Sequence, residues 1–198
     1  MIKFQNNCDS EPYKLLRYFY DLAEKSNQES IDAFLISSYS MKNKEVDARF
    51  VNLKFVIDKD FIFFSNYESP KAMQFRNHNQ VAAVIYWNSI NTQVRLKGKI
   101  EKTSKDFNQN YFKSREKHKN ALAISSKQSL PVKSYNLVKE NYNNILSDED
   151  LTICPEYWGG FSLRPYYFEF WEGNNSRINK RVCFKNIEDE WQKSLLQP

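Results

Sequence analysis

Glycine is scarce in this sequence, which has only four in 198 residues: Gly98, Gly159, Gly160 and Gly173. Neither a GxGxxG fingerprint nor a P-loop occurs, because both need glycines at close and fixed spacing. If the protein binds a nucleotide, side chains and a helix end must therefore hold the phosphate.

Cysteine and histidine are also rare. The three cysteines, Cys8, Cys154 and Cys183, are odd in number, lie far apart and form no CxxC pair. This pattern argues against a disulfide framework or a zinc site and is typical of reduced thiols in the cytoplasm. His78 and His118 give no HxxxH or HxH spacing, so we expect no histidine-based metal site.

Two further absences concern membranes and nucleic acids. Positions 5–7 are polar where a signal peptide needs apolar residues, and no later stretch approaches the roughly twenty apolar residues of a membrane span. The 29 Lys and Arg residues against 24 Asp and Glu give a net charge of +5, which suits phosphate ligands but lacks the strong excess of a nucleic-acid binder. We therefore expect a cytoplasmic protein without membrane or nucleic-acid partners.

What is present is a succession of short β-rich runs. The length favours one domain over 1–198, and it opens with an N-terminal helical segment (1–30), because apolar residues recur at helical spacing between 11 and 28. Helices are also predicted at 105–115, 120–126 and 132–146. Strands are predicted at 33–38, 48–57, 61–66, 81–87, 92–101, 160–171, 181–185 and 190–195. This order favours a mainly β fold, an antiparallel barrel with flanking helices.

A short helix is predicted to run from Ser69 to residue 76, with Ser69 as N-cap and Pro70 at the first helical position. Lys71 then carries a positive charge at the positive end of the helix dipole. That placement is unfavourable unless an anion binds there, which makes Lys71 a candidate phosphate ligand. A solvated lysine in the first turn is the alternative interpretation.

Arg49 and Lys54 lie five residues apart in an otherwise apolar strand, so in a regular strand they point to opposite faces. Both reach one ligand only if the strand contains a bulge or if the site is shared between two subunits. In the alternative interpretation, one of them is a charge that protects an edge strand from aggregation.

Two other groups combine basic and aromatic side chains. Tyr111 and Arg115 are four residues apart on a predicted helix and share a face, so Arg115 is suited to clamp a phosphate beside the Tyr111 hydroxyl. Arg177 and Arg181 flank a polar turn after Trp171, which places two anion clamps near a flat ring. The alternatives are ordinary surface stacking for the first pair and a solvated basic turn for the second.

Taken in chain order, the residues described above resemble the pyridoxamine 5'-phosphate oxidase family, and the similarity runs from about position 31 to position 198. The similarity rests on many spaced stretches rather than on one motif: 49–54 (RFVNLK), 64–71 (FSNYESPK), 93–95 (QVR), 111–115 (YFKSR), 127–129 (KQS), 157–161 (YWGGF), 168–171 (FEFW), and the ending with Trp191 and 195–198 (LLQP).

The resemblance implies an FMN-binding split β-barrel that forms a homodimer, with the flavin in a cleft between the two subunits. A shared site also accounts for the opposite faces of Arg49 and Lys54. The positions implied to bind FMN are Arg49, Phe50, Val51, Asn52, Leu53, Lys54, Phe64, Ser65, Lys71, Gln93, Gln128, Ser129, Trp171 and Arg181. The positions implied to hold a phosphorylated B6 vitamer are Lys54, Tyr111, Arg115, Arg177 and Asn179, of which Arg177 and Asn179 are the candidate catalytic residues.

The sequence departs from the family pattern at three positions. Asn179 stands where the family has a substrate-facing histidine, and an amide forms hydrogen bonds but does not take up a proton near neutral pH as imidazole does. Pro70 replaces a common phosphate-binding arginine, and Lys119 replaces a common substrate-contacting serine. The residues implied to bind FMN are therefore better preserved than those implied to bind the substrate.

The function implied by the resemblance is an FMN-dependent oxidase that converts pyridoxamine or pyridoxine 5'-phosphate to pyridoxal 5'-phosphate with O2 and releases H2O2. The cofactor carries the redox chemistry, and the protein supplies orientation and electrostatics. Two alternatives remain open because of the departures. One is a flavin oxidase of the same fold with another substrate, for example a reduced phenazine precursor, and the other is a non-catalytic protein that binds FMN or pyridoxal phosphate.

Overall fold

The computed structural model describes residues 1–148 and 150–198. The helices are α1 (Glu11–Lys25), α2 (Pro70–Asn77), α3 (Lys105–Ser114), α4 (Lys117–Ser125) and α5 (Tyr135–Asp148), with a 3-10 turn, η1 (Asn88–Ile90). The strands are β1 (Lys3–Gln5), β2 (Ala33–Ser40), β3 (Glu45–Ile57), β4 (Asp60–Asn66), β5 (Gln80–Trp87), β6 (Thr92–Lys102), β7 (Trp158–Glu172), β8 (Lys180–Ile187) and β9 (Glu190–Leu196). Over the described residues, no helix is long and apolar enough to cross a lipid bilayer.

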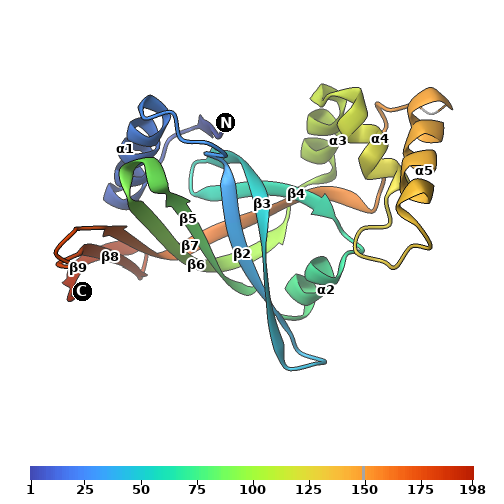
Figure 1. Cartoon of the computed structure of the whole chain (residues 1–198). Coiled ribbons are helices and arrows are strands. Elements are labelled where there is room, and N and C mark those ends of the chain that lie inside the picture. Colours follow the sequence, from blue (N-terminus) through green and yellow to red (C-terminus); the bar gives the residue numbers. More distant parts are fainter. Residues whose placement is uncertain (149) are drawn as a thin grey trace.

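Six antiparallel strands close into a barrel in the order β2, β5, β6, β7, β4 and β3, because β4 pairs with both β3 and β7. β1 pairs in parallel with β3, while β8 and β9 extend the sheet beyond β7. Figure 1 shows α3, α4 and α5 grouped on one side of the barrel and β8 and β9 on the opposite side. The mainly β split barrel with flanking helices is therefore confirmed.

Side chains alternate between the two faces of each strand, and aromatic rings occupy many of the inward-facing positions of the barrel. Phe61 and Phe63 of β4 and Phe168 of β7 are fully buried, and Phe168 lies beside Tyr13 of α1 with ring centroids 5.0 Å apart. Phe19 of the same helix is also buried. The amphipathic helix expected near the N-terminus therefore packs its apolar face against the barrel, where burial of large apolar side chains stabilises both elements.

The boundaries of several elements differ from the sequence predictions. In the N-terminal segment a short strand, β1, precedes α1, and α1 ends at Lys25 rather than near residue 28 because Asn27 adopts a left-handed backbone with φ 52°. α3 ends at Ser114, so Arg115 is the extended residue that follows the helix rather than its last member. A change of this kind is common because helix ends depend on local caps.

Candidate functional site

A cleft of about 760 Å³ lies between the barrel, the first turn of α2 and the helices α3 and α4. It is formed by β3 and β4, by the start of α2, by the end of α3 and by the chain after α4. Twelve of the residues predicted for the site line it: Arg49, Phe50, Val51, Asn52, Lys54, Phe64, Ser65, Lys71, Tyr111, Arg115, Gln128 and Ser129. Its size and its mixed polar and aromatic lining suit a small-molecule cofactor.

A β-bulge brings Arg49 and Lys54 to the same cleft. The pairing of β3 with β4 shifts by one residue between Leu53 and Phe55, which leaves Lys54 as the extra residue. A bulge of this kind interrupts the regular alternation of faces and re-aims a side chain. The Leu53 side chain is fully buried in the barrel core, so only its backbone is available to a ligand.

Lys71 is buried at the start of α2, where Ser69 is the N-cap residue and Pro70 the first helical residue, as predicted. Its Nζ donates a 2.9 Å hydrogen bond to Gln128 Oε1 and a 3.3 Å hydrogen bond to Ser69 Oγ. Ser65 Oγ donates to the same Gln128 oxygen at 3.0 Å. Among the residues whose side chains the structure describes, 1–147 and 150–198, no carboxylate forms an ion pair with Lys71. Burial and the nearby Arg49 charge lower the pKa of Lys71 to about 8.

A buried ammonium that bonds only to neutral acceptors is costly, and an anion at the helix start offsets this cost. The rest of the cleft has the same sign of charge. Its basic lining residues are Lys3, Arg49, Lys54, Lys71, Arg115 and Lys119. Among the described lining residues, Glu116 is the one with an acidic side chain, and it accepts a 2.8 Å hydrogen bond from Lys119. The cleft is therefore suited to ligands with one or more anionic groups.

Aromatic rings form one wall of the cleft. The Phe64 ring stacks on Tyr111 with centroids 3.9 Å apart and on Trp158 with centroids 5.1 Å apart. Arg115 lies over Trp158 at 4.5 Å and donates a 3.0 Å hydrogen bond to Asn120 Oδ1. Arg115 and Tyr111 thus face the cleft together although α3 ends before Arg115. A flat aromatic wall beside cations is suited to a ligand that combines a ring with a phosphate.

The remaining predicted residues do not line this cleft. Gln93, Trp171 and Arg181 are directly opposite one another on β6, β7 and β8. Arg177 is exposed in the turn after β7, with a left-handed φ of 62°, and the Asn179 Oδ1 accepts a 3.0 Å hydrogen bond from the Asn174 backbone N–H. Within a single chain, the predicted site is therefore divided into two separate clusters.

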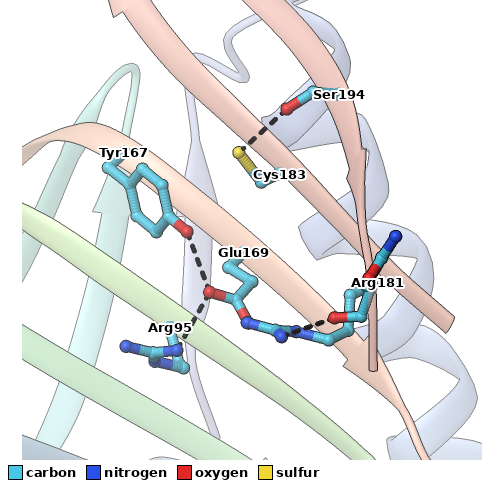
Figure 2. Close-up of polar contacts among 7 residues, drawn as sticks. Arg95, Tyr167, Glu169, Arg181, Cys183 and Ser194 are labelled. Atoms are coloured by element: carbon cyan, nitrogen blue, oxygen red, sulfur yellow. Dashed lines mark hydrogen bonds and ion pairs between the residues drawn. The ribbon is translucent and has the colours of Figure 1, made fainter. Parts of the chain in front are cut away.

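Two functional candidates escaped the sequence analysis. Asp32, on the chain before β2, accepts a 2.7 Å hydrogen bond from Lys54 Nζ and lies 3.7 Å from the Met1 amino group. These cations outweigh the effect of burial and lower the pKa of the Asp32 carboxyl. Glu169 of β7 is buried between Arg95 and Arg181 (Figure 2). A single acidic residue carries no periodic signal, and only the fold reveals which cation it contacts.

Comparisons with known proteins agree with this geometry. Residues 25–145 match the family model described as pyridoxamine 5'-phosphate oxidase, and residues 158–198 match the pyridoxine 5'-phosphate oxidase C-terminal dimerisation region. The chain is 32% identical over 198 residues to a pyridoxine/pyridoxamine 5'-phosphate oxidase of Coxiella burnetii, covering 98% of this chain and 100% of that protein. The corresponding enzyme of Colwellia psychrerythraea is 32% identical over 195 residues, covering 97% and 89% of the two chains.

Two solved structures share the fold at low sequence identity. PhzG from Burkholderia lata, solved in complex with tetrahydrophenazine-1-carboxylic acid, superposes with a TM-score of 0.89 at 19% identity and covers 96% of this chain and 93% of its own. A pyridoxamine 5'-phosphate oxidase-related, FMN-binding protein from Nostoc punctiforme has a TM-score of 0.78 at 12% identity, with coverages of 96% and 100%. The chain therefore belongs to the pyridoxamine 5'-phosphate oxidase family of FMN-binding split-barrel proteins and is an oxidoreductase of this type.

Proposed function

We propose that this protein is an FMN-dependent oxidase that converts pyridoxamine or pyridoxine 5'-phosphate to pyridoxal 5'-phosphate. The observation that carries the proposal is the buried Lys71 ammonium, which has no carboxylate partner among the side chains that the structure describes (1–147 and 150–198). It lies at a helix start within a cation-lined, aromatic-walled cleft. FMN fits this lining because it combines a flat ring system with a phosphate.

The Lys71 end of the cleft is the proposed site for the FMN phosphate. Ser65, Gln128 and Ser129 surround Lys71 there, and the first turn of α2 contributes the positive end of its dipole. The β3 residues 49–54 run along the same cleft and supply backbone and side-chain contacts for the remainder of FMN. A charge-assisted hydrogen bond from Lys71 is the strongest single contact expected in this set.

The α3 end of the cleft is the proposed site for the substrate phosphate. Lys54, Tyr111 and Arg115 provide two charges and a hydroxyl there, and holding the phosphate orients the reacting carbon. Pyridoxine phosphate and O2 give pyridoxal phosphate and H2O2, while pyridoxamine phosphate also consumes water and releases ammonia. FMN supplies the hydride-accepting chemistry when bound. Arg177 and Asn179 are proposed to contact the substrate, with Asn179 acting as a hydrogen-bonding group rather than as an acid or base.

A homodimer is part of the proposal. One chain provides the cleft, and the partner is proposed to bring the cluster of Gln93, Trp171, Arg181, Arg177 and Asn179 to it. The match of residues 158–198 to a dimerisation region supports this arrangement, because four of these five residues lie in that range.

An anaerobic titration with pyridoxamine 5'-phosphate tests the proposed function. We expect the purified, FMN-loaded protein to lose its flavin absorbance as substrate is added, which reports hydride transfer to the flavin. Binding without bleaching would instead favour a carrier of FMN or pyridoxal phosphate. Bleaching by a reduced phenazine precursor but not by either B6 vitamer would assign the protein to a different substrate, in agreement with the changes at Asn179 and Lys119.

A further inference from the structure

The carboxylate of Glu169 is the centre of a hydrogen-bond network with Arg95, Tyr167 and Arg181 (Figure 2). It lies on the face of β7 opposite to the buried Phe168 and Phe170. Arg181 donates to Glu169 Oε1 from Nε at 3.0 Å and from Nη2 at 2.8 Å. Arg95 Nη1 and the Tyr167 hydroxyl donate to Glu169 Oε2 at 3.0 and 2.8 Å. The Glu169 side chain is only 3% exposed, so its charge is enclosed by these donors.

Glu169 lies in the sheet next to a row of predicted FMN residues. Gln93, Trp171 and Arg181 form one cross-strand row, and Arg95 and Glu169 belong to the next row of the same face. The intervening side chains of β7 point into the barrel core, because Phe168 and Phe170 are buried there. Glu169 therefore contacts Arg181 from the neighbouring row of the same face, and both side chains point away from the barrel core.

This network restrains the Arg181 guanidinium but does not occupy all of its N–H donors. A guanidinium has five N–H donors, and three of them bond to Glu169 Oε1 and to the Gln197 backbone carbonyl, which accepts from Nη1 at 2.8 Å. The contacts of the described residues therefore leave two N–H groups for a ligand. An unrestrained arginine samples many rotamers, and a restrained one loses less entropy when it binds.

We propose that Glu169 is a positioning residue for FMN: it orients the Arg181 guanidinium so that the two remaining N–H groups face a flavin held in the partner subunit's cleft. The proposal rests on the proposed function and its homodimer. The charge state of Glu169 is consistent with this role, since the hydrogen bonds and charges of Arg181, Tyr167 and Arg95 outweigh burial and lower the pKa of the Glu169 carboxyl. It stays a carboxylate at neutral pH.

The test compares three variants by FMN affinity, measured by fluorescence quenching, and by the melting temperature of the FMN-free protein. Glu169→Gln keeps the size of the side chain but removes its charge, and we expect about tenfold weaker FMN binding. Arg181→Ala should weaken binding to a similar degree, and the double variant should bind FMN no more weakly than Arg181→Ala alone. This lack of additivity is what separates a positioning role from a general structural role.

The matched control is Asp60→Asn. Asp60 accepts two hydrogen bonds from Arg164, at 2.9 Å from Nε and 2.7 Å from Nη2, and neither residue lines the cleft. The control therefore breaks a bidentate pair of the same type elsewhere on the barrel. We expect it to change the melting temperature without changing FMN affinity by more than about twofold.

The outcomes are distinct. Unchanged FMN affinity in Glu169→Gln, or a double variant that binds FMN about tenfold more weakly than Arg181→Ala, overturns the proposal. The proposed function is kept in either case if the wild-type protein binds FMN. A wild-type protein that binds no FMN overturns both. If Glu169→Gln does not fold, Arg181→Lys decides, because lysine keeps the charge but not the planar fork. About tenfold weaker binding in Arg181→Lys supports the proposal, and unchanged binding overturns it.

Discussion

Trp158 lies in the cleft at the first residue of β7, and Trp171 lies thirteen residues further along the same strand, beside Arg181. At about 3.3 Å per residue, the two indoles are separated by about 40 Å of strand. A small cofactor does not bridge that length. If both ends of β7 take part in one site, they belong to two different subunits.

Subunit mixing tests this arrangement. Neither Lys71→Ala nor Arg181→Ala should bind FMN well alone, but a mixed dimer contains one cleft with Lys71 that faces a partner with Arg181. With random exchange, about half of the dimers are mixed and about a quarter of all sites are intact. We expect FMN binding and oxidase activity to recover to about that level after mixing, measured by fluorescence and by peroxide release. No recovery, although exchange is verified by mass spectrometry, would place each site within one chain.

Lys71→Ala should weaken FMN binding. The substitution removes a charge-assisted hydrogen bond, which is worth about 1.5–3 kcal/mol, or roughly tenfold to a hundredfold in affinity. We expect the upper part of this range because Pro70 provides no second cation at the helix start. Fluorescence-quenching titrations measure the change, and Lys99→Ala, at an exposed lysine on β6 outside the cleft, is the control. Equal affinity in both variants would mean that Lys71 does not bind the phosphate.

FMN binding should also depend on pH through Lys71. In the FMN-free protein its pKa is lowered to about 8 by burial and by Arg49, so the ammonium is charged below that pH and neutral above it. The phosphate is already a dianion there, since its second pKa is about 6. We therefore expect affinity to be constant from pH 7 to 8 and to fall by up to about tenfold per unit above pH 8. In Lys71→Ala this decrease should be absent, and a decrease of the same size there would assign it to another group.

Asn179→His should raise kcat/KM for pyridoxamine or pyridoxine 5'-phosphate. The substitution restores an imidazole where the family resemblance places one, but most of the chemistry belongs to the flavin, so we expect only about tenfold, or roughly 1.4 kcal/mol. Peroxide-coupled assays at matched FMN occupancy measure the effect. Asn175→His, an exposed position of the same turn, controls for a histidine added nearby. A parent enzyme already as fast as the His variant would show that Asn179 is fully functional.

Much of the fold was readable from the sequence. The alternation of apolar residues in the β-rich runs predicts strands, and Ser69 with Pro70 predicts the start of α2, because these are local preferences of the backbone. The residues of the cleft could also be named, since the stretches around Arg49, Phe64 and Tyr111 are recognisable in order. Short β1 was not predicted, because its pairing with β3 is a long-range contact with no local signal.

The amino-acid sequence by itself determined strands β2 to β9, the start of α2 at Pro70 beside Lys71, and the family to which the chain belongs. Only the tertiary structure decided that a bulge carries Lys54 into the cleft with Arg49, and that the site residues of one chain fall into two clusters at opposite ends of β7. It also decided that Glu169 contacts Arg181. The reason is that a side chain's partner is set by strand register and barrel closure, which join residues far apart in the chain.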